Sequence, residues 1–132
     1  FVGGSLGVST RTGRGDRVAR AFFGGPSPGR DKPIPDAPAP DATHFLTGNP
    51  MYPPWPAGME EAMFGMGCFW CSENLYMAKE GIYSSQVGYA GGESNNPSYQ
   101  DVCTGMSGHN EVVRIVYDPK VITYGDLLKV FW

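Results

Sequence analysis

The chain has 132 residues, of which 10 are Lys or Arg and 13 are Asp or Glu, for a formal net charge of −3. This balance gives no reason to expect nucleic acid as a partner. No apolar stretch approaches the roughly 18–20 residues that span a membrane, so no membrane association is expected. Three cysteines do not suit a disulfide-stapled secreted scaffold, and a soluble protein in a reducing compartment is predicted.

The first 58 residues are predicted to lie outside the folded domain. Residues 1–23 carry four arginines and one aspartate, a bias typical of an organelle transit segment. A transit segment would indicate a plastid or mitochondrion, whereas a flexible tail without a targeting role would indicate the cytoplasm. Ten of the 12 prolines lie in residues 24–58. Because proline fixes φ and removes a backbone donor, this segment is predicted to be a disordered linker.

Residues 59–132 are predicted to form the folded domain. The apolar run 63–66 lacks alternation, as in a strand that is covered on both faces. A helix follows and is predicted to end at Gly81 as its C′ residue. Its apolar stripe is assigned to three residues at helical spacing, Cys71, Leu75 and Ala78.

The second half of this domain shows two further strands and a helix. Residues 84–90 and 111–117 have strand patterns, and a short helical turn is expected at 99–103. Thr123 is a predicted N-cap with Asp126 in capping-box position. This order of elements predicts an α+β fold in layers. The chain starts at Phe1 and stops within an apolar-periodic segment, so we expect an incomplete sequence whose C-terminal part is missing.

Cys68 is the best candidate for chemistry. It follows Gly67 at the junction between the predicted strand and helix. Free N–H groups and the positive end of a helix dipole favour a thiolate at such a position. Phe69 and Trp70 supply apolar walls that suit a small methylated group. The alternative is a buried cysteine that acts as a small hydrophobic residue.

Cys71 forms a Cys-x-x-Cys pair with Cys68, which opens two other interpretations. A thioredoxin-like dithiol oxidoreductase is the first, but that fold needs a proline before a later strand, whereas Pro119 follows a strand in a turn. A zinc site built with Cys103 and His109 is the second. Zinc would occupy the candidate nucleophile, and no second Cys-x-x-Cys supports it. No metal is therefore expected.

Two polar residues are candidates for proton donation. Alternate residues of the strand 111–117 share one apolar face, so Glu111 begins on the side that faces the core. A carboxyl group at the mouth of an apolar layer can donate a proton near neutral pH, although a solvated charge at a strand end is the alternative. Arg114 lies on the opposite face and is expected to extend its charge into water. Tyr99 and His109 could each donate a hydrogen bond.

Seven motifs follow one another within residues 61–132: Gly67-Cys-Phe-Trp70, Val87-Gly-Tyr-Ala-Gly-Gly92, Asn96-Pro-Ser-Tyr99, Val102-Cys103, Gly108-His109, Glu111-Val-Val-Arg114 and Leu127-Leu-Lys-Val-Phe-Trp132. In this order they resemble the A-type peptide methionine sulfoxide reductases. The resemblance implies a two-layer sandwich with a mixed sheet around a ferredoxin-like core. It also implies a monomer that reduces the S epimer of methionine sulfoxide, free or in proteins, without a metal or other cofactor.

The resemblance assigns roles to the candidate residues. Cys68 attacks the sulfoxide sulfur, while Phe69 and Trp70 hold the methyl group of the substrate. Glu111, assisted by Tyr99, protonates or polarises the sulfoxide oxygen. Methionine leaves, and the cysteine is left as a sulfenic acid. A second thiol then condenses with it, and thioredoxin restores the dithiol.

The chain departs from the family at the position of Cys71, where most members carry glycine or another small residue. This difference suggests that Cys71 is a local resolving thiol for Cys68. Cys103 is the other available thiol and is expected to be structural. The segment that follows the Phe-Trp motif in the family, with its recycling cysteines, has no counterpart in these 132 residues.

Overall fold

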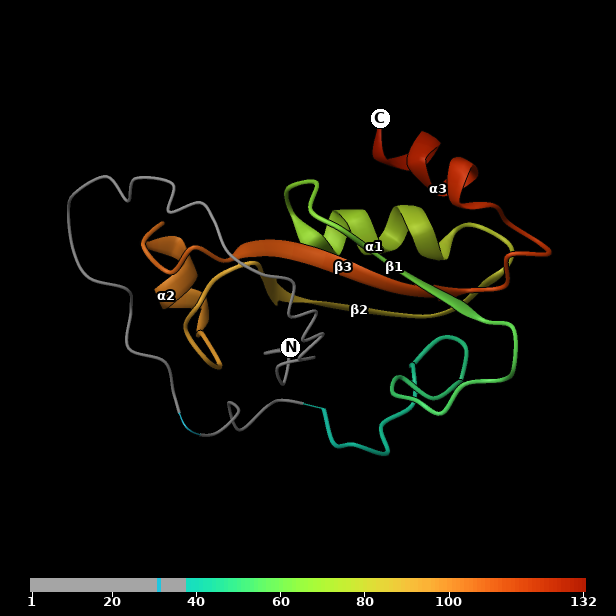
Figure 1. The fold of residues 1–132 in the computed structure, drawn as a ribbon, viewed down its shortest axis with the longest axis horizontal. Coiled ribbons are helices and arrows are strands. Elements are labelled where there is room, and N and C mark those ends of the chain that lie inside the picture. The colour runs from blue at the N-terminus through green and yellow to red at the C-terminus, as the bar shows by residue number, and fades with distance from the viewer. Residues whose placement is uncertain (1–30, 32–37) are drawn as a thin grey trace, which may run out of the picture.

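The computed structural model describes residue 31 and residues 38–132. Three strands and three helices alternate along the chain (Figure 1): β1 Glu60–Phe64, α1 Phe69–Met77, β2 Ile82–Ala90, α2 Tyr99–Cys103, β3 Asn110–Tyr117 and α3 Tyr124–Phe131. The predicted α+β class is confirmed. The possible transit segment 1–23 lies outside the described residues. Within the described part, no helix has the length and apolarity that a membrane span requires.

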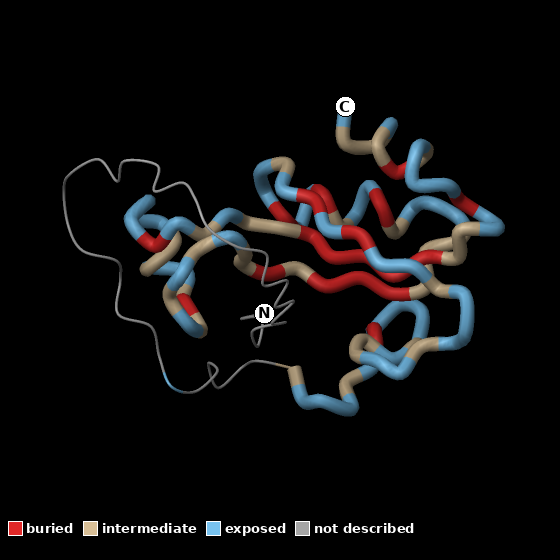
Figure 2. The backbone as a smooth tube through the Cα atoms, in the orientation of Figure 1, coloured by how far each residue is buried: buried red, intermediate tan, exposed pale blue. Residues whose placement is uncertain are grey.

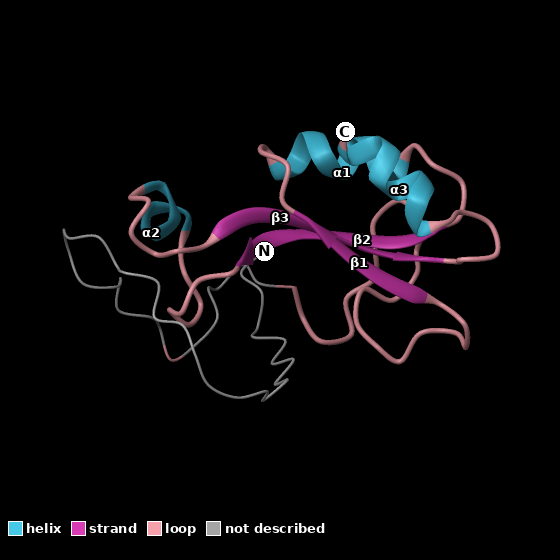
Figure 3. Ribbon diagram, turned by 45° about the horizontal axis from the view of Figure 1, so that its top comes forward, coloured by secondary structure: helices cyan, strands magenta, loops and turns pink. Residues whose placement is uncertain are grey.

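The three strands form one sheet in the order β1-β3-β2, and both neighbouring pairs are antiparallel. The expectation of a mixed sheet is therefore wrong for the described residues. β1 and β2 run in the same direction, but β3 lies between them, so no two adjacent strands are parallel. α1 makes the connection across this gap, which is the split βαβ arrangement. α1 and α3 lie on the same face of the sheet (Figure 3).

The hydrophobic core lies between the sheet and these two helices. The residues of β3 predicted to face it, Val113, Ile115 and Tyr117, are buried. Tyr76 of α1 and Leu127 of α3 are fully buried against them. Figure 2 shows that buried residues follow the strands, whereas the outer surfaces of the helices are exposed. Burial of apolar area here is the main stabilising contribution to the fold.

The predicted apolar stripe of the first helix is wrong. Cys71, Leu75 and Ala78 are exposed. The buried residues are instead Phe69, Ser72 and Tyr76. Tyr76 stacks on the ring of Phe64 with 5.0 Å between centroids, which provides more contact area than a smaller side chain could. The helix also ends at Met77, four residues before Gly81, so that glycine is not its C′ residue.

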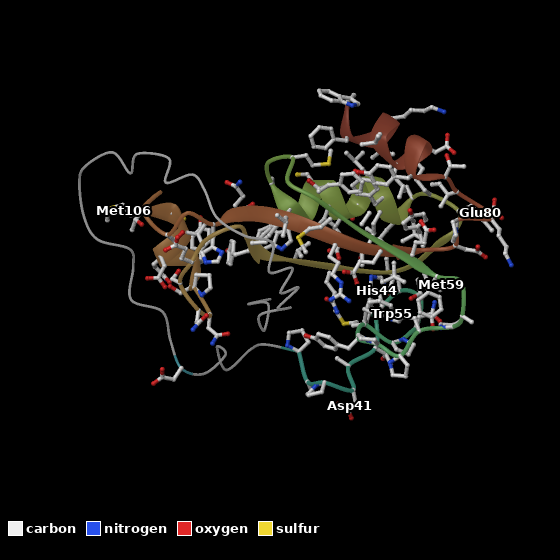
Figure 4. All side chains as sticks on the ribbon, in the orientation of Figure 1. Asp41, His44, Trp55, Met59, Glu80 and Met106 are labelled. Carbon is white, nitrogen blue, oxygen red and sulfur yellow. The ribbon has the colours of Figure 1, made fainter. Side chains whose placement is uncertain are left out.

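The segment 38–58, predicted as part of a linker, packs against the sheet. Thr47 Oγ1 and Asn49 Nδ2 both donate to the carbonyl oxygen of Tyr83 on the outer edge of β2, at 3.0 Å and 2.8 Å. His44 is buried with its Nε2 3.0 Å from Ser85 Oγ. His44 and Trp55, which both belong to this segment, are labelled in Figure 4. The prolines prevent helices here, as expected, but they do not keep the segment away from the domain.

Arg114 is buried, which contradicts the expectation that its charge extends into water. Its Nη1 donates to Gln86 Oε1 at 2.9 Å, and its Nε lies 3.3 Å from Glu61 Oε2. The guanidinium also stacks over the ring of Trp55 at 5.0 Å. Because the segment 38–58 covers this face of the sheet, Arg114 cannot reach bulk water.

Replacement of Leu127 by alanine is expected to lower the free energy of unfolding by about 2–5 kcal/mol, because it opens a cavity at the centre of the core. The comparison variant is Val121→Ala. Because Val121 is 55% exposed, this substitution should lower the free energy of unfolding far less. Urea denaturation followed by circular dichroism measures both. Equal losses in the two variants would contradict the assignment of the core.

Candidate functional site

Cys68 occupies the N-cap position of α1. Gly67 reaches it with φ of +96°, a backbone conformation that favours glycine. The carbonyl oxygen of Cys68 accepts from the N–H group of Ser72 at 3.1 Å and from the Ser72 hydroxyl at 3.0 Å. These bonds hold the backbone of Cys68 at the start of the helix and leave its thiol exposed.

The surroundings of Cys68 lower the pKa of its thiol. The N–H group of Cys71 makes the largest contribution, followed by the Cys71 thiol and then, after an opposing effect of burial, the N–H group of Trp70. The same interaction raises the pKa of Cys71, because the Cys71 thiol keeps its proton when it donates to Cys68. The pair is therefore polarised, with Cys68 as the favoured thiolate and Cys71 as the thiol.

Glu111, predicted only to face the core from the start of its strand, lies beside this helix start. It is the second residue of β3, is partly buried, and its Oε2 accepts from the N–H group of Phe69 at 3.2 Å. Its charge raises the pKa of Cys68, against the lowering effects described above. An open hollow next to it is lined by Gly65, Gly67, Asn110 and Glu111. The structure thus brings the Cys68 thiol and a carboxyl group from distant parts of the chain to one helix N-terminus.

The two predicted aromatic residues have different environments. Phe69 is buried, whereas Trp70 is 68% exposed, and their ring centroids lie 5.6 Å apart. A third aromatic residue, Tyr89, was not among the predicted site residues. Its ring centroid lies 5.5 Å from that of Phe69. Burial, and then the charge of Glu111, raises the pKa of Tyr89, so the phenol stays protonated beside the carboxyl group.

Tyr99 begins α2, which lies at one end of the sheet (Figure 1). A capping box between Ser98 and Asp101 fixes the start of this short helix. A hydrogen bond to Cys103 raises the pKa of Tyr99, and the charge of Glu111 raises it further. Tyr99 is therefore within electrostatic reach of Glu111 as a protonated phenol, and Cys103 is its neighbour rather than the neighbour of Cys68.

The four residues of the alternative zinc interpretation do not gather. All three cysteines are free thiols. His109 uses both ring nitrogens on the backbone, with Nδ1 accepting from Gly92 N–H at 3.2 Å and Nε2 lying 2.9 Å from Ser94 O. Within residues 38–132, no group of three or more His, Cys, Asp or Glu side chains is placed to hold a metal ion.

Comparison with known proteins gives one consistent family. The family model described as "Peptide methionine sulfoxide reductase" matches residues 60–132, more than half of the chain. "Peptide methionine sulfoxide reductase MsrA" of Rippkaea orientalis is 53% identical over 105 residues, which cover 80% of this chain and 46% of that protein. The protein of the same name from Brucella ovis gives the same values. The chain thus spans about half the length of the curated relatives it matches.

Solved structures agree with these sequence comparisons. "Methionine sulfoxide reductase A of Corynebacterium diphtheriae" superposes with a TM-score of 0.66 at 34% identity, covering 79% of this chain and 46% of that one. Reduced Mxr1 from Saccharomyces cerevisiae gives a TM-score of 0.53 at 36% identity, covering 58% and 46% of the two chains. Fold and sequence therefore point to the same group of proteins.

Proposed function

This chain belongs to the peptide methionine sulfoxide reductase family, and from that premise we propose that it reduces methionine S-sulfoxide, free or in proteins, to methionine. The reaction depends on thiols and repairs oxidised proteins. One observation carries the proposal: Cys68, with its thiolate favoured, begins the helix whose first N–H group is bound by the Glu111 carboxyl group. A nucleophile and a proton donor therefore meet at one helix start, where Glu111 also lines an open hollow.

The first chemical step uses both groups. The Cys68 thiolate attacks the sulfoxide sulfur while protonated Glu111 gives its proton to the sulfoxide oxygen. The attack forms a bond between the two sulfur atoms. The protonated oxygen then transfers to the Cys68 sulfur as that bond and the sulfur–oxygen bond of the substrate break, so that methionine leaves and Cys68 is left as a sulfenic acid. A proton on Glu111 also favours the Cys68 thiolate before the attack, because it removes the carboxylate charge that raises the pKa of Cys68. Tyr99 assists as a hydrogen-bond donor to the oxygen.

The methyl group of the substrate is held by Phe69 and Trp70. Phe69 forms the buried floor, and the exposed ring of Trp70 is tilted against it by 41°. Tyr89 packs on Phe69 at 5.5 Å and extends the same apolar wall toward Glu111. This cluster suits an apolar methyl group adjacent to the polar sulfoxide.

The second step restores the thiol. The Cys71 thiol, which already donates to Cys68, attacks the sulfenic sulfur, and water leaves as the disulfide forms. Thioredoxin then supplies two electrons and regenerates both thiols while it is itself oxidised. Cys71 serves as the resolving residue because it is one helical turn from Cys68, whereas Cys103 is engaged with Tyr99.

The active protein is proposed to be a monomer, and its fold is proposed to have a ferredoxin-like core. Three strands in the order β1-β3-β2, with α1 and α3 on one face, support this proposal. The order matches a split βαβ unit followed by a further strand and helix.

The function is tested by incubating the protein with each epimer of methionine sulfoxide and with dithiothreitol as reductant. Methionine is quantified by chromatography. We expect methionine from the S epimer and none above background from the R epimer. Equal rates with both epimers, or reduction of neither, would overturn the proposed activity.

Replacement of Cys71 by serine tests the resolving thiol. The variant is expected to release about one methionine per protein and then to turn over poorly with thioredoxin, because no local thiol removes the sulfenic acid. Rapid quenching measures the first methionine, and trapping with dimedone followed by mass spectrometry detects the sulfenic acid on Cys68. Cys103→Ser is the matched control and should recycle normally. Unimpaired recycling in the Cys71 variant would exclude this role.

A further inference from the structure

His109 connects two segments that flank the proposed site. Its Nδ1 accepts a hydrogen bond from Gly92 N–H at 3.2 Å, and its Nε2 lies 2.9 Å from the carbonyl oxygen of Ser94. Since a carbonyl oxygen can only accept, Nε2 carries the proton and Nδ1 is bare. Only the neutral ring with its proton on Nε2 satisfies both contacts.

The His109 ring packs against Gly92 and leaves no room for a side chain there. A Cβ atom added to Gly92 would collide with His109 Cδ2 and with the carbonyl oxygen of Ser107. No other residue type therefore fits at Gly92 without displacing the ring or the backbone. The backbone N–H group of His109 is itself bound to Ser107 Oγ at 3.2 Å, which restrains the ring from its own side.

This contact lies immediately beyond the last pair of the β2–β3 ladder, Ala90 with Asn110. The ring takes the place of the next backbone hydrogen bonds and keeps the two segments together where the strands separate. The preceding pair of the ladder joins Tyr89 to Glu111. Glu111 therefore stands only two residues from His109, at the end of the sheet that would otherwise fray.

We propose that neutral His109 is a positioning residue that holds the loop 91–97 on β3 and thereby fixes both Glu111 and Tyr99. Glu111 is fixed through β3, which continues directly from His109. Tyr99 is fixed through the loop, which runs from Gly92 to the N-cap residue Ser98 of α2. The part of this inference that concerns catalysis rests on the proposed function, whereas the contact itself does not.

Protonation of Nδ1 breaks the arrangement, because two N–H groups then face each other at Gly92. The loop is therefore expected to be held while the ring is neutral and released when the ring gains a second proton. The cavity that His109 lines is also lined by four titratable or charged residues, Tyr52, Tyr89, Glu93 and Arg114, and Glu111 lies two residues further along the chain on β3.

Amide hydrogen exchange of Gly92 tests the contact without any enzyme assay. The protection factor is measured on the 132-residue chain at about pH 8 and about pH 5, on either side of the range in which histidine titrates. We expect at least tenfold protection at the higher pH and its loss at the lower pH. Protection that does not change with pH would overturn the requirement for a neutral ring.

Two substitutions test the roles of the two ring nitrogens separately. In His109→Asn the side-chain oxygen takes the place of Nδ1, so Gly92 should stay protected at both pH values. In His109→Gln the amide nitrogen takes the place of Nε2, so the contact to Ser94 is kept while Gly92 loses its acceptor at both pH values. Identical protection of Gly92 in these two variants would overturn the proposal.

The catalytic consequence is measured on the same proteins. His109→Ala is expected to lower kcat for methionine S-sulfoxide about 10- to 100-fold with a smaller change in KM, since displaced groups weaken the transition state most. His109→Asn should recover most of kcat. Its kcat should also fall less at acid pH than that of the unmodified chain, because the asparagine side chain cannot be protonated there. Full activity in His109→Ala would overturn the positioning role. Absence of activity in the unmodified chain would instead count against the proposed function and leave the exchange result intact.

Discussion

Replacement of Cys68 by serine is expected to lower the turnover of methionine S-sulfoxide by about a thousandfold or more. The N–H groups and the Cys71 thiol around this position favour a negative charge on sulfur. They cannot produce an alkoxide at neutral pH, because a serine hydroxyl is far less acidic than a thiol. Methionine formation with dithiothreitol as reductant measures the loss.

Cys103→Ser is the matched control for the number of thiols, since Cys103 lies on α2 beside Tyr99. It should change turnover far less than Cys68→Ser does. Circular dichroism of the Cys68 variant should match that of the parent, because the side chain is exposed. A Cys68→Ser protein that still reduces the sulfoxide would falsify the assignment of the nucleophile.

Replacement of Glu111 by glutamine is expected to act in opposite directions on activity and on thiol reactivity. Turnover should fall by about 10²- to 10⁴-fold, because an amide cannot deliver the proton to the sulfoxide oxygen. The pKa of Cys68 should fall further, since the carboxylate charge that raises it is removed. Alkylation by iodoacetamide, which reports the thiolate, should therefore reach half of its maximal rate at a lower pH than in the parent.

The glutamine side chain retains an oxygen that can accept from Phe69 N–H, so the start of α1 should keep its geometry. Glu80→Gln removes the same charge from an exposed turn and serves as the control, with neither property expected to change. A Glu111 variant in which thiol alkylation shifts to higher pH would contradict the electrostatic account. One with normal turnover would remove Glu111 from the proposed mechanism.

Much of the folded domain could be predicted from local patterns. The alternation along β3 correctly placed Val113, Ile115 and Tyr117 in the core, and the capping box at Thr123 correctly located the start of α3. The face of α1 was predicted wrongly because spacing alone treats Leu75 as a better core residue than Ser72. In the structure Ser72 is buried, because its hydroxyl finds an acceptor on Cys68 and leaves room for Phe69 and Tyr76.

The site likewise has features that neighbouring residues predict and features that depend on contacts between distant parts of the chain. The position of Cys68 at a helix start follows from neighbouring residues, so the sequence alone suffices to find it. The bond between Glu111 and Phe69 N–H joins residues 42 apart in the sequence, and it depends on β3 lying between β1 and β2. Tyr89 was missed although its strand 84–90 was predicted, because only the register of β2 against β3 pairs it with Glu111.

The covering of β2 and Arg114 by the segment 38–58 has a consequence for where this protein can be divided. The family model begins at residue 60, yet the carbonyl of Tyr83, the hydroxyl of Ser85 and the guanidinium of Arg114 all have partners before that residue. A clone that starts at residue 59 would retain every proposed catalytic group but lose the contacts that Asn49, His44 and Trp55 make with these three groups. The start of the family model at residue 60 therefore falls inside the packed unit, which includes the segment 38–58 as judged by burial and hydrogen bonding.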